Sequence, residues 1–206
     1  MLLHREPSEE LVRRFISSQR GLPFSYAQAG ATQSEAPAGY PPGYNVDHNR
    51  IKLGSGEETY ARATAALREW KQFDLGWVKV APPGQPIEVG TIVAVQAKVF
   101  GLWWVNAARI VYVVDEERDQ TVRFGFAYGT LPDHVERGEE RFTVEWRKNE
   151  DDSVWYDLFA FSRPKHPLTR IGFPLTRALQ RRFVRDSLAV MKAASENRGQ
   201  RKSSSI

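Results

Sequence analysis

The hydrophobic pattern changes its period along this chain, and the change constrains the fold more than any other feature. Over residues 57–73, apolar side chains recur at the spacing of a helix. From residue 77 to residue 161, apolar and polar residues alternate in short segments separated by turn residues, which predicts a series of β-strands. The helical spacing returns at residues 174–194. Strands joined by short turns pair as hairpins, so we expect an antiparallel sheet.

The order of these elements predicts the architecture. The expected strands are residues 50–53, 77–80, 91–100, 102–114, 122–128, 140–147 and 154–161, with a longer loop at residues 129–138. A strand, a helix, a strand meander and a long final helix belong to the α+β class. We expect a helix-grip fold, in which a curved antiparallel sheet of about six or seven strands is closed by the C-terminal helix. The buried face of that helix is expected to consist of Leu175, Leu179, Phe183 and Val190.

The two ends of the chain differ from this middle part. Ser8 is a candidate N-cap for a short helix, and residues 25–44 are rich in Ala, Gly and Pro. We expect residues 1–195 to form one domain, with residues 1–45 as an N-terminal helix and extended segment packed on it. Residues 196–206 are polar and basic, and we expect a disordered tail.

Composition excludes several classes of protein. The chain has no cysteine, which excludes disulfides, cysteine-ligated metals and thiol catalysis. Its longest apolar stretch is residues 99–105, whereas a helix across a bilayer needs roughly 20 residues. The first residues include acidic side chains and no long apolar core, so we expect no signal peptide and a cytoplasmic location.

The net charge of +4 is unevenly distributed. Residues 163–206 hold 11 of the 29 Lys and Arg residues and only two acidic ones. A basic helix and tail of this kind can bind nucleic acid. No nucleic-acid-binding motif accompanies the charge, so a solvated helix face is the favoured interpretation and nucleic acid is not an expected partner.

One segment carries a family resemblance. Residues 128–142 read YGTLPDHVERGEERF, and residues 43–47, 53–56 and 161–164 together with Trp70 are similarly distinctive. Together they resemble an uncharacterised family of bacteria and plants, a domain of unknown function, over residues 24–191. That family is grouped with the START-like, birch-pollen-allergen-like helix-grip superfamily (SRPBCC). The resemblance implies a small apolar or amphipathic molecule held between sheet and terminal helix, but it transfers no catalytic residue.

Aromatic side chains on the expected strands form the first part of a candidate site. Trp104, Phe126 and Trp146 are among a dozen rings on these segments, and some must line the concave side of a curved sheet. Aromatic walls with a few polar groups are typical of ligand pockets. The same rings can instead fill a solid core, and the sequence does not separate the two.

Polar residues in and next to the expected strands form the second part of the candidate site. Asn106 shares a strand face with Trp104 and is the preferred inward candidate, because a buried amide needs a partner or a ligand. The hydroxyls of Tyr128 and Thr130 end the preceding strand at the expected mouth of the pocket. His134 and Glu139 lie in the following loop, where a histidine with carboxylates is suited to acid–base work.

Neither a metal nor a cofactor is expected. The four histidines are scattered along the sequence, and a metal site needs three or four converging ligands. Gly54-Ser55-Gly56 lacks the Lys-Ser/Thr of a phosphate-binding loop and is interpreted as a tight turn.

Three functions remain open at this point. The favoured one is a module that binds a small hydrophobic molecule through Trp104, Asn106, Phe126, Tyr128, Thr130, His134, Glu139 and Trp146. The second is a cyclase-like or hydrolase-like enzyme on the same scaffold, which requires Tyr128, His134 and Glu139 to converge. The third is binding of nucleic acid or a protein through the basic helix, and exposed aromatic edges also fit a homodimer.

Overall fold

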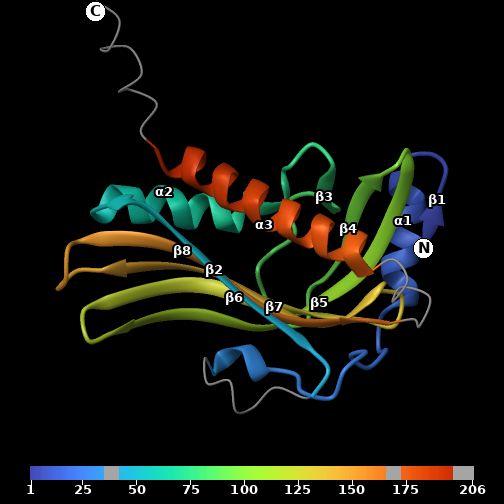
Figure 1. Cartoon of the computed structure of the whole chain (residues 1–206), viewed down its shortest axis with the longest axis horizontal. Helices are drawn as coiled ribbons and strands as arrows, with labels where there is room; N and C mark the ends of the chain where they lie inside the picture. The colour runs from blue at the N-terminus through green and yellow to red at the C-terminus, as the bar shows by residue number, and fades with distance from the viewer. Residues whose placement is uncertain (35–41, 166–172, 197–206) are drawn as a thin grey trace, which may run out of the picture.

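The computed structural model describes residues 1–34, 42–165 and 173–196 (Figure 1). Its elements are β1 (Leu2–Leu3), α1 (Glu9–Ser18), η1 (Ala31–Gln33), β2 (Asn45–Ser55), α2 (Glu57–Arg68), η3 (Lys71–Phe73), β3 (Val78–Ala81), β4 (Ile92–Val99), β5 (Leu102–Arg118), β6 (Thr121–Thr130), β7 (Glu136–Arg147), β8 (Ser153–Pro164) and α3 (Phe173–Ser195). Of the tail expected at residues 196–206, residues 197–206 lie outside the described residues.

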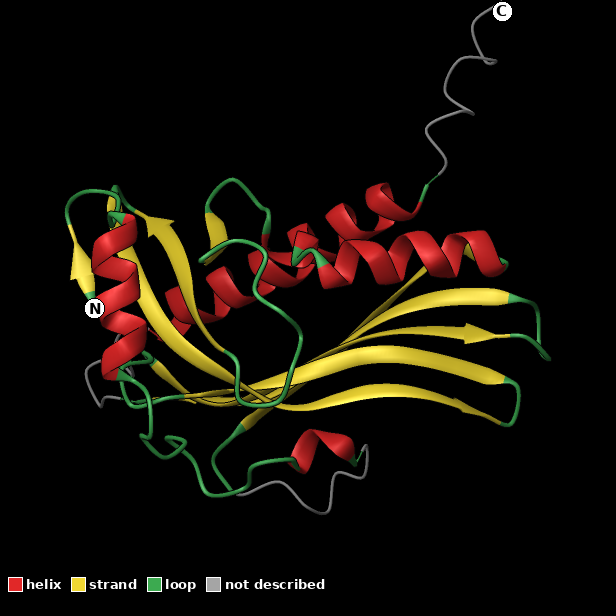
Figure 2. Cartoon of the chain, turned by 180° about the vertical axis from the view of Figure 1, so that it is seen from behind, coloured by secondary structure: helices red, strands yellow, loops and turns green. Residues whose placement is uncertain are grey.

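The described strands form one antiparallel sheet. Its order is β2-β8-β7-β6-β5-β4-β3, and β1 pairs with β5 beside that path. The sheet curves around α3, and α2 lies next to α3 on the same concave side (Figures 1 and 2). This is the expected α+β helix-grip fold, with eight strands in place of six or seven.

The main core lies between the concave face and the two long helices. The ring of Phe73 packs 5.3 Å from that of Phe142 on β7 and 5.3 Å from that of Phe183 on α3. Met191 and Leu67 are fully buried in the same cluster. Apolar burial of this kind is the main force that holds a helix against a sheet. In the described ranges, no helix is both long and apolar enough to cross a membrane.

The convex face is covered by residues 24–33, which we call the strap (Figure 1). The carboxylate of Glu139 accepts hydrogen bonds from the backbone N–H groups of Gly30 (2.7 Å) and Thr32 (2.9 Å), and from the hydroxyls of Tyr26 (2.6 Å) and Thr32. Gly129 lies beside Tyr26, and a side chain at this position would overlap the tyrosine ring. Glu139 therefore anchors the strap to the middle of the sheet.

Several element boundaries differ from the sequence expectation. β2 spans Asn45–Ser55 rather than 50–53, because its backbone pairs with β8 along this length despite a bulge between Lys52 and Gly54. β7 begins at Glu136, so the expected loop at 129–138 shrinks to residues 131–135. α2 ends at Arg68 rather than at residue 73, since Trp70 has a left-handed backbone that ends the helix (φ 60°).

The buried stripe of α3 also differs from the predicted one. Phe183 is packed against the core as expected, but Leu175 is 45% exposed. Ser187, Met191 and Ser195 are buried on this helix, and Val190 is not part of the core cluster. The helix face toward the core is therefore centred on Phe183, Ser187 and Met191. The hydroxyl of Ser187 lies 3.1 Å from that of Tyr156.

The anchoring role of Glu139 gives a stability prediction. Glu139→Gln replaces one acceptor oxygen by an NH₂ group that faces N–H donors, so we expect the free energy of unfolding to fall by about 2 kcal/mol. Urea unfolding followed by circular dichroism measures this change. Glu88→Gln, at an exposed position, is the matched control and should change nothing. Equal stability of the two variants would contradict the anchoring role.

Candidate functional site

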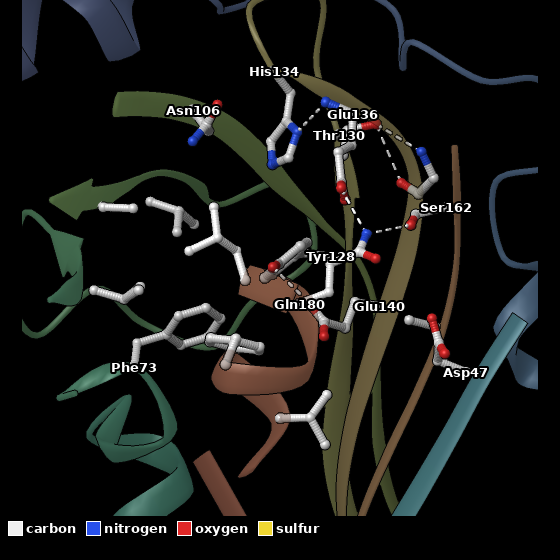
Figure 3. A pocket seen from close by; sticks show the side chains of 18 of the residues that line it. Asp47, Phe73, Asn106, Tyr128, Thr130, His134, Glu136, Glu140, Ser162 and Gln180 are labelled. Carbon is white, nitrogen blue, oxygen red and sulfur yellow. Dashed lines mark hydrogen bonds between the residues drawn. The ribbon is translucent and has the colours of Figure 1, made fainter. Parts of the chain in front are cut away.

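A pocket lies between the concave face of the sheet and α3, with a volume of about 200 Å³ (Figure 3). Its apolar wall is formed by Phe73, Trp77, Val78, Val95, Ala97, Leu158, Ala160, Leu179, Phe183 and Val184. Its polar wall is formed by Asp47, Asn106, Tyr128, Thr130, His134, Glu136, Glu139, Glu140, Ser162 and Gln180, with Gly138. The polar residues gather mainly where β6, β7 and β8 meet the N-terminal half of α3.

Glu140 and Tyr128 form a hydrogen-bonded pair inside the pocket. The two residues are opposite each other in the β6–β7 register, and the Tyr128 hydroxyl donates to Glu140 Oε2 over 2.7 Å. Burial raises the pKa of the Glu140 carboxyl to about 8, and the negative charges of Glu136 and Asp47 act in the same direction. The bond from Tyr128 opposes this rise without cancelling it. Glu140 is therefore largely protonated at neutral pH.

Glu136 connects the sheet to α3. Gln180 Nε2 donates to Glu136 Oε1 over 2.6 Å and to Ser162 Oγ over 3.2 Å. Burial raises the pKa of Glu136 to about 6, against the opposing effects of Gln180, Ser162 and Arg177. Arg177, one helical turn before Gln180, forms a two-pronged ion pair with Asp47 at 2.6 and 2.7 Å. These bonds fix the N-terminal half of α3 over the pocket.

His134 and Asn106 supply donor groups at the other end of the polar wall. His134 Nδ1 accepts from the backbone N–H of Glu136 (3.0 Å), and burial lowers the pKa of the ring to about 4. The ring is therefore neutral near pH 7 and carries its proton on Nε2. Asn106 Oδ1 accepts from the N–H of Val135 (3.2 Å). Across residues 1–34, 42–165 and 173–196, neither His134 Nε2 nor Asn106 Nδ2 has a hydrogen-bond partner.

Five of the eight residues expected at the site line the pocket, and three lie elsewhere. Asn106, Tyr128, Thr130 and His134 line the pocket, although the Thr130 hydroxyl is engaged by the backbone N–H of Gly138 (3.0 Å). Glu139 borders the pocket, but its carboxylate is bound by the strap on the opposite face. The expected convergence of Tyr128, His134 and Glu139 therefore does not occur, and Tyr128 is paired with Glu140 instead.

Three expected aromatic residues lie elsewhere. Phe126 is packed in the core, 4.8 Å from the ring of Trp70. Trp146 stacks on Tyr60 near the far end of β7, 5.9 Å between ring centroids. Trp104 on β5 is paired with Leu2 of β1. None of these three lines the pocket.

The sequence contained a signal for the residues that were missed. Glu140 lies on the same face of its strand as the buried Phe142, whereas Glu139 lies on the opposite face. Glu136 was assigned to a loop, so no strand face was available for it. Gln180 and Ser162 carry no motif. In the part of the chain that the structure describes, no three His, Asp or Glu side chains converge as metal ligands.

The raised carboxyl pKa values predict a dependence of stability on pH. The folded chain holds a proton on Glu140 up to pH about 8, whereas the unfolded chain loses it near the ordinary value of 4.5. Glu140 should therefore lower the free energy of unfolding as pH rises from 5 to 8, whereas the lowered pKa of His134 contributes a rise up to about pH 6.5. Glu140→Gln removes this titration, so its stability relative to the natural chain should rise by at least about 1.4 kcal/mol over that range. Urea unfolding at pH 5, 6.5 and 8 measures the difference, and a constant difference would contradict the assignment.

Comparison with solved structures supports the fold. The chain is similar to a hypothetical protein of Helicobacter pylori, with a TM-score of 0.50 and 13% identity, over 79% of this chain and 95% of that one. It is also similar to a truncated norcoclaurine synthase of Thalictrum flavum, with a TM-score of 0.43 and 16% identity, over 75% and 96%. At 13% identity the likeness to the Helicobacter pylori protein concerns the fold alone.

Comparison of sequences identifies the family. A family model described as a domain of unknown function (DUF1990) matches residues 25–190. A UPF0548 protein of Dictyostelium discoideum is 38% identical over 214 residues, which cover 98% of this chain and 99% of that protein. A UPF0548 protein of Deinococcus radiodurans is 36% identical over 198 residues, with coverage of 90% and 94%. The chain therefore belongs to the DUF1990 family, as the segment at residues 128–142 predicted.

Proposed function

We propose that this protein binds a small amphipathic molecule in the pocket between the sheet and α3. The observation that carries the proposal is a hollow with one apolar wall and one polar wall whose donors, Asn106 Nδ2 and His134 Nε2, have no partner among the described residues. Buried polar groups normally have partners, and a bound molecule would supply them. The apolar wall would contribute affinity and the polar wall orientation.

The size of the pocket limits the molecule. A volume of about 200 Å³ is below the roughly 300–1,000 Å³ of most ligand sites. It would hold about seven water molecules at liquid density. A compound with one ring and a short polar arm fits this volume better than a steroid or a fatty acid.

An enzyme on the same scaffold is a second candidate, and one observation favours it. Glu140 is a carboxyl group with a pKa of about 8, bonded to the Tyr128 hydroxyl inside a pocket, which suits a general acid or base near neutral pH. Native mass spectrometry of the purified chain and of Glu140→Gln tests this candidate. A guest of different mass in the variant would indicate a trapped substrate, whereas the same guest in both would indicate binding without chemistry.

The third candidate, binding of nucleic acid by the basic helix, has less support. Arg177 is paired with Asp47, and both Arg182 and Arg185 contact Asp186. These three cations of α3 are therefore already partly neutralised within the protein.

The binding proposal predicts the effect of filling the pocket. Ala160 lies on the pocket wall, so Ala160→Leu should reduce the volume and weaken the binding of benzyl alcohol at least about tenfold. Ala193→Leu, on an exposed position of α3, adds the same side chain outside the pocket and should bind like the natural chain. Isothermal titration calorimetry measures the three affinities. Equal affinity of both variants, or no binding to the natural chain at millimolar concentration, would refute the proposal.

A further inference from the structure

The charges of the polar wall point to the chemical class of the ligand. Resting on the proposed function, we infer that the ligand carries a cationic amine, held at the Glu140 carboxyl in the field of Glu136, together with a hydroxyl or carbonyl group that accepts from Asn106. This inference follows from three features of the pocket: its charge balance, its vacant acceptor atoms and its unpartnered donors.

Negative charge exceeds positive charge around the pocket. Besides Glu139, whose carboxylate is bound by the strap, three acidic residues line it: Asp47 on β2 and both Glu136 and Glu140 on β7. The neighbouring guanidinium of Arg177 is bonded through two nitrogens to Asp47. Among the described residues, neither Glu136 nor Glu140 forms an ion pair. A cation entering the pocket would therefore meet two carboxyl groups without a cationic partner.

The carboxyl groups also retain acceptor capacity. An ionised carboxylate offers about four lone-pair sites. Glu140 receives one hydrogen bond, from Tyr128, and its Oε1 receives none from the described residues. Glu136 receives a hydrogen bond at Oε1 from Gln180, and a hydrogen bond from Ser162 also favours its charged form. An ammonium group has three donors and can fill these vacant sites with charge-assisted bonds, which are the stronger kind.

A separate observation on another strand indicates a second polar group on the ligand. Asn106, on β5, is only 7% exposed and lines the pocket, yet its Nδ2 donors have no partner among the described residues. His134 presents a further donor at Nε2 near Asn106 (Figure 3). The N-terminal ammonium and Lys165 add positive potential at this end, since both lower the pKa of His134. An oxygen acceptor on the ligand would satisfy these donors.

Other ligand charges fit less well. An anion would be repelled by Glu136 and Asp47, whose charges add to the effect of burial in raising the pKa of Glu140. A neutral molecule would leave the buried charge of Glu136 without a cationic partner. An amine would instead bind as the ion pair, with Glu140 releasing its proton. The groups that face Glu140 in this reaction are Tyr128, Glu136, Asp47 and Tyr156.

Three probes with one ring and different charge test this inference: benzylamine, benzyl alcohol and benzoate. On the full chain at pH 7, calorimetry should show benzylamine binding at least about tenfold more tightly than benzyl alcohol, and benzoate more weakly than both. Titrations in phosphate and in Tris should reveal the release of close to one proton per benzylamine and of none per benzyl alcohol.

Two variants test whether Glu140 causes the preference for benzylamine over benzyl alcohol. Glu140→Gln should reduce the preference for benzylamine over benzyl alcohol to about threefold or less and abolish proton release, while Glu88→Gln should retain both. Binding of benzyl alcohol as tightly as benzylamine to the natural chain would overturn the amine assignment and leave the pocket proposal standing. Binding of none of the probes would overturn both. Since the natural chain alone separates these outcomes, the test holds even if Glu140→Gln folds poorly.

Discussion

The strict alternation of side chains along β7 is the constraint on which both faces of this protein depend. β7 lies in the middle of the sheet, paired with β6 on one side and β8 on the other. Successive residues of a strand point to opposite faces. Glu140 and Glu136 therefore face α3, while Glu139 faces the strap. A register slip of one residue would exchange these roles and leave both faces with the wrong groups.

The two faces use similar carboxyl groups for opposite purposes. Glu139 receives four hydrogen bonds from the strap, so its charge is well compensated and its role is structural. Glu140 receives one, from Tyr128, and lies in a hollow. Retaining an acidic group there costs stability, which is typical of a functional position rather than a structural one. The bonds of Gln180 and Arg177 hold α3 over this hollow and keep it from collapsing.

Much of the architecture could be predicted from the sequence. The switch from helical to alternating spacing gave the meander and both flanking helices, and Ser8 caps α1 as its sequence position indicated. Boundaries were less predictable, because the length of β2 is set by pairing with β8, more than 100 residues away. The buried face of α3 was also predicted wrongly, since Ser187 on that face is polar. Ser187 is buried beside Tyr156, and hydrophobic spacing does not reveal this.

The site was less predictable than the fold. Asn106 was expected at the pocket as a polar residue in an apolar strand, and Tyr128, Thr130 and His134 from their place at a strand end and in the loop after it. All four line the pocket. Glu136 and Gln180 could not be assigned, because their meeting depends on how α3 crosses the sheet. Trp104, Phe126 and Trp146 were chosen as large rings on strands, and sequence alone does not reveal which end of a long strand faces a cavity.

The most direct measurement is methyl NMR of the full chain titrated with benzylamine. The account predicts saturable shifts of the pocket methyl groups of Val95, Leu158 and Val184, and no shift at Val105 or Leu131 in the separate cluster beneath α1. Shifts confined to exposed residues, or no saturable shift at millimolar concentration, would contradict the claim that the pocket between sheet and α3 is a binding site.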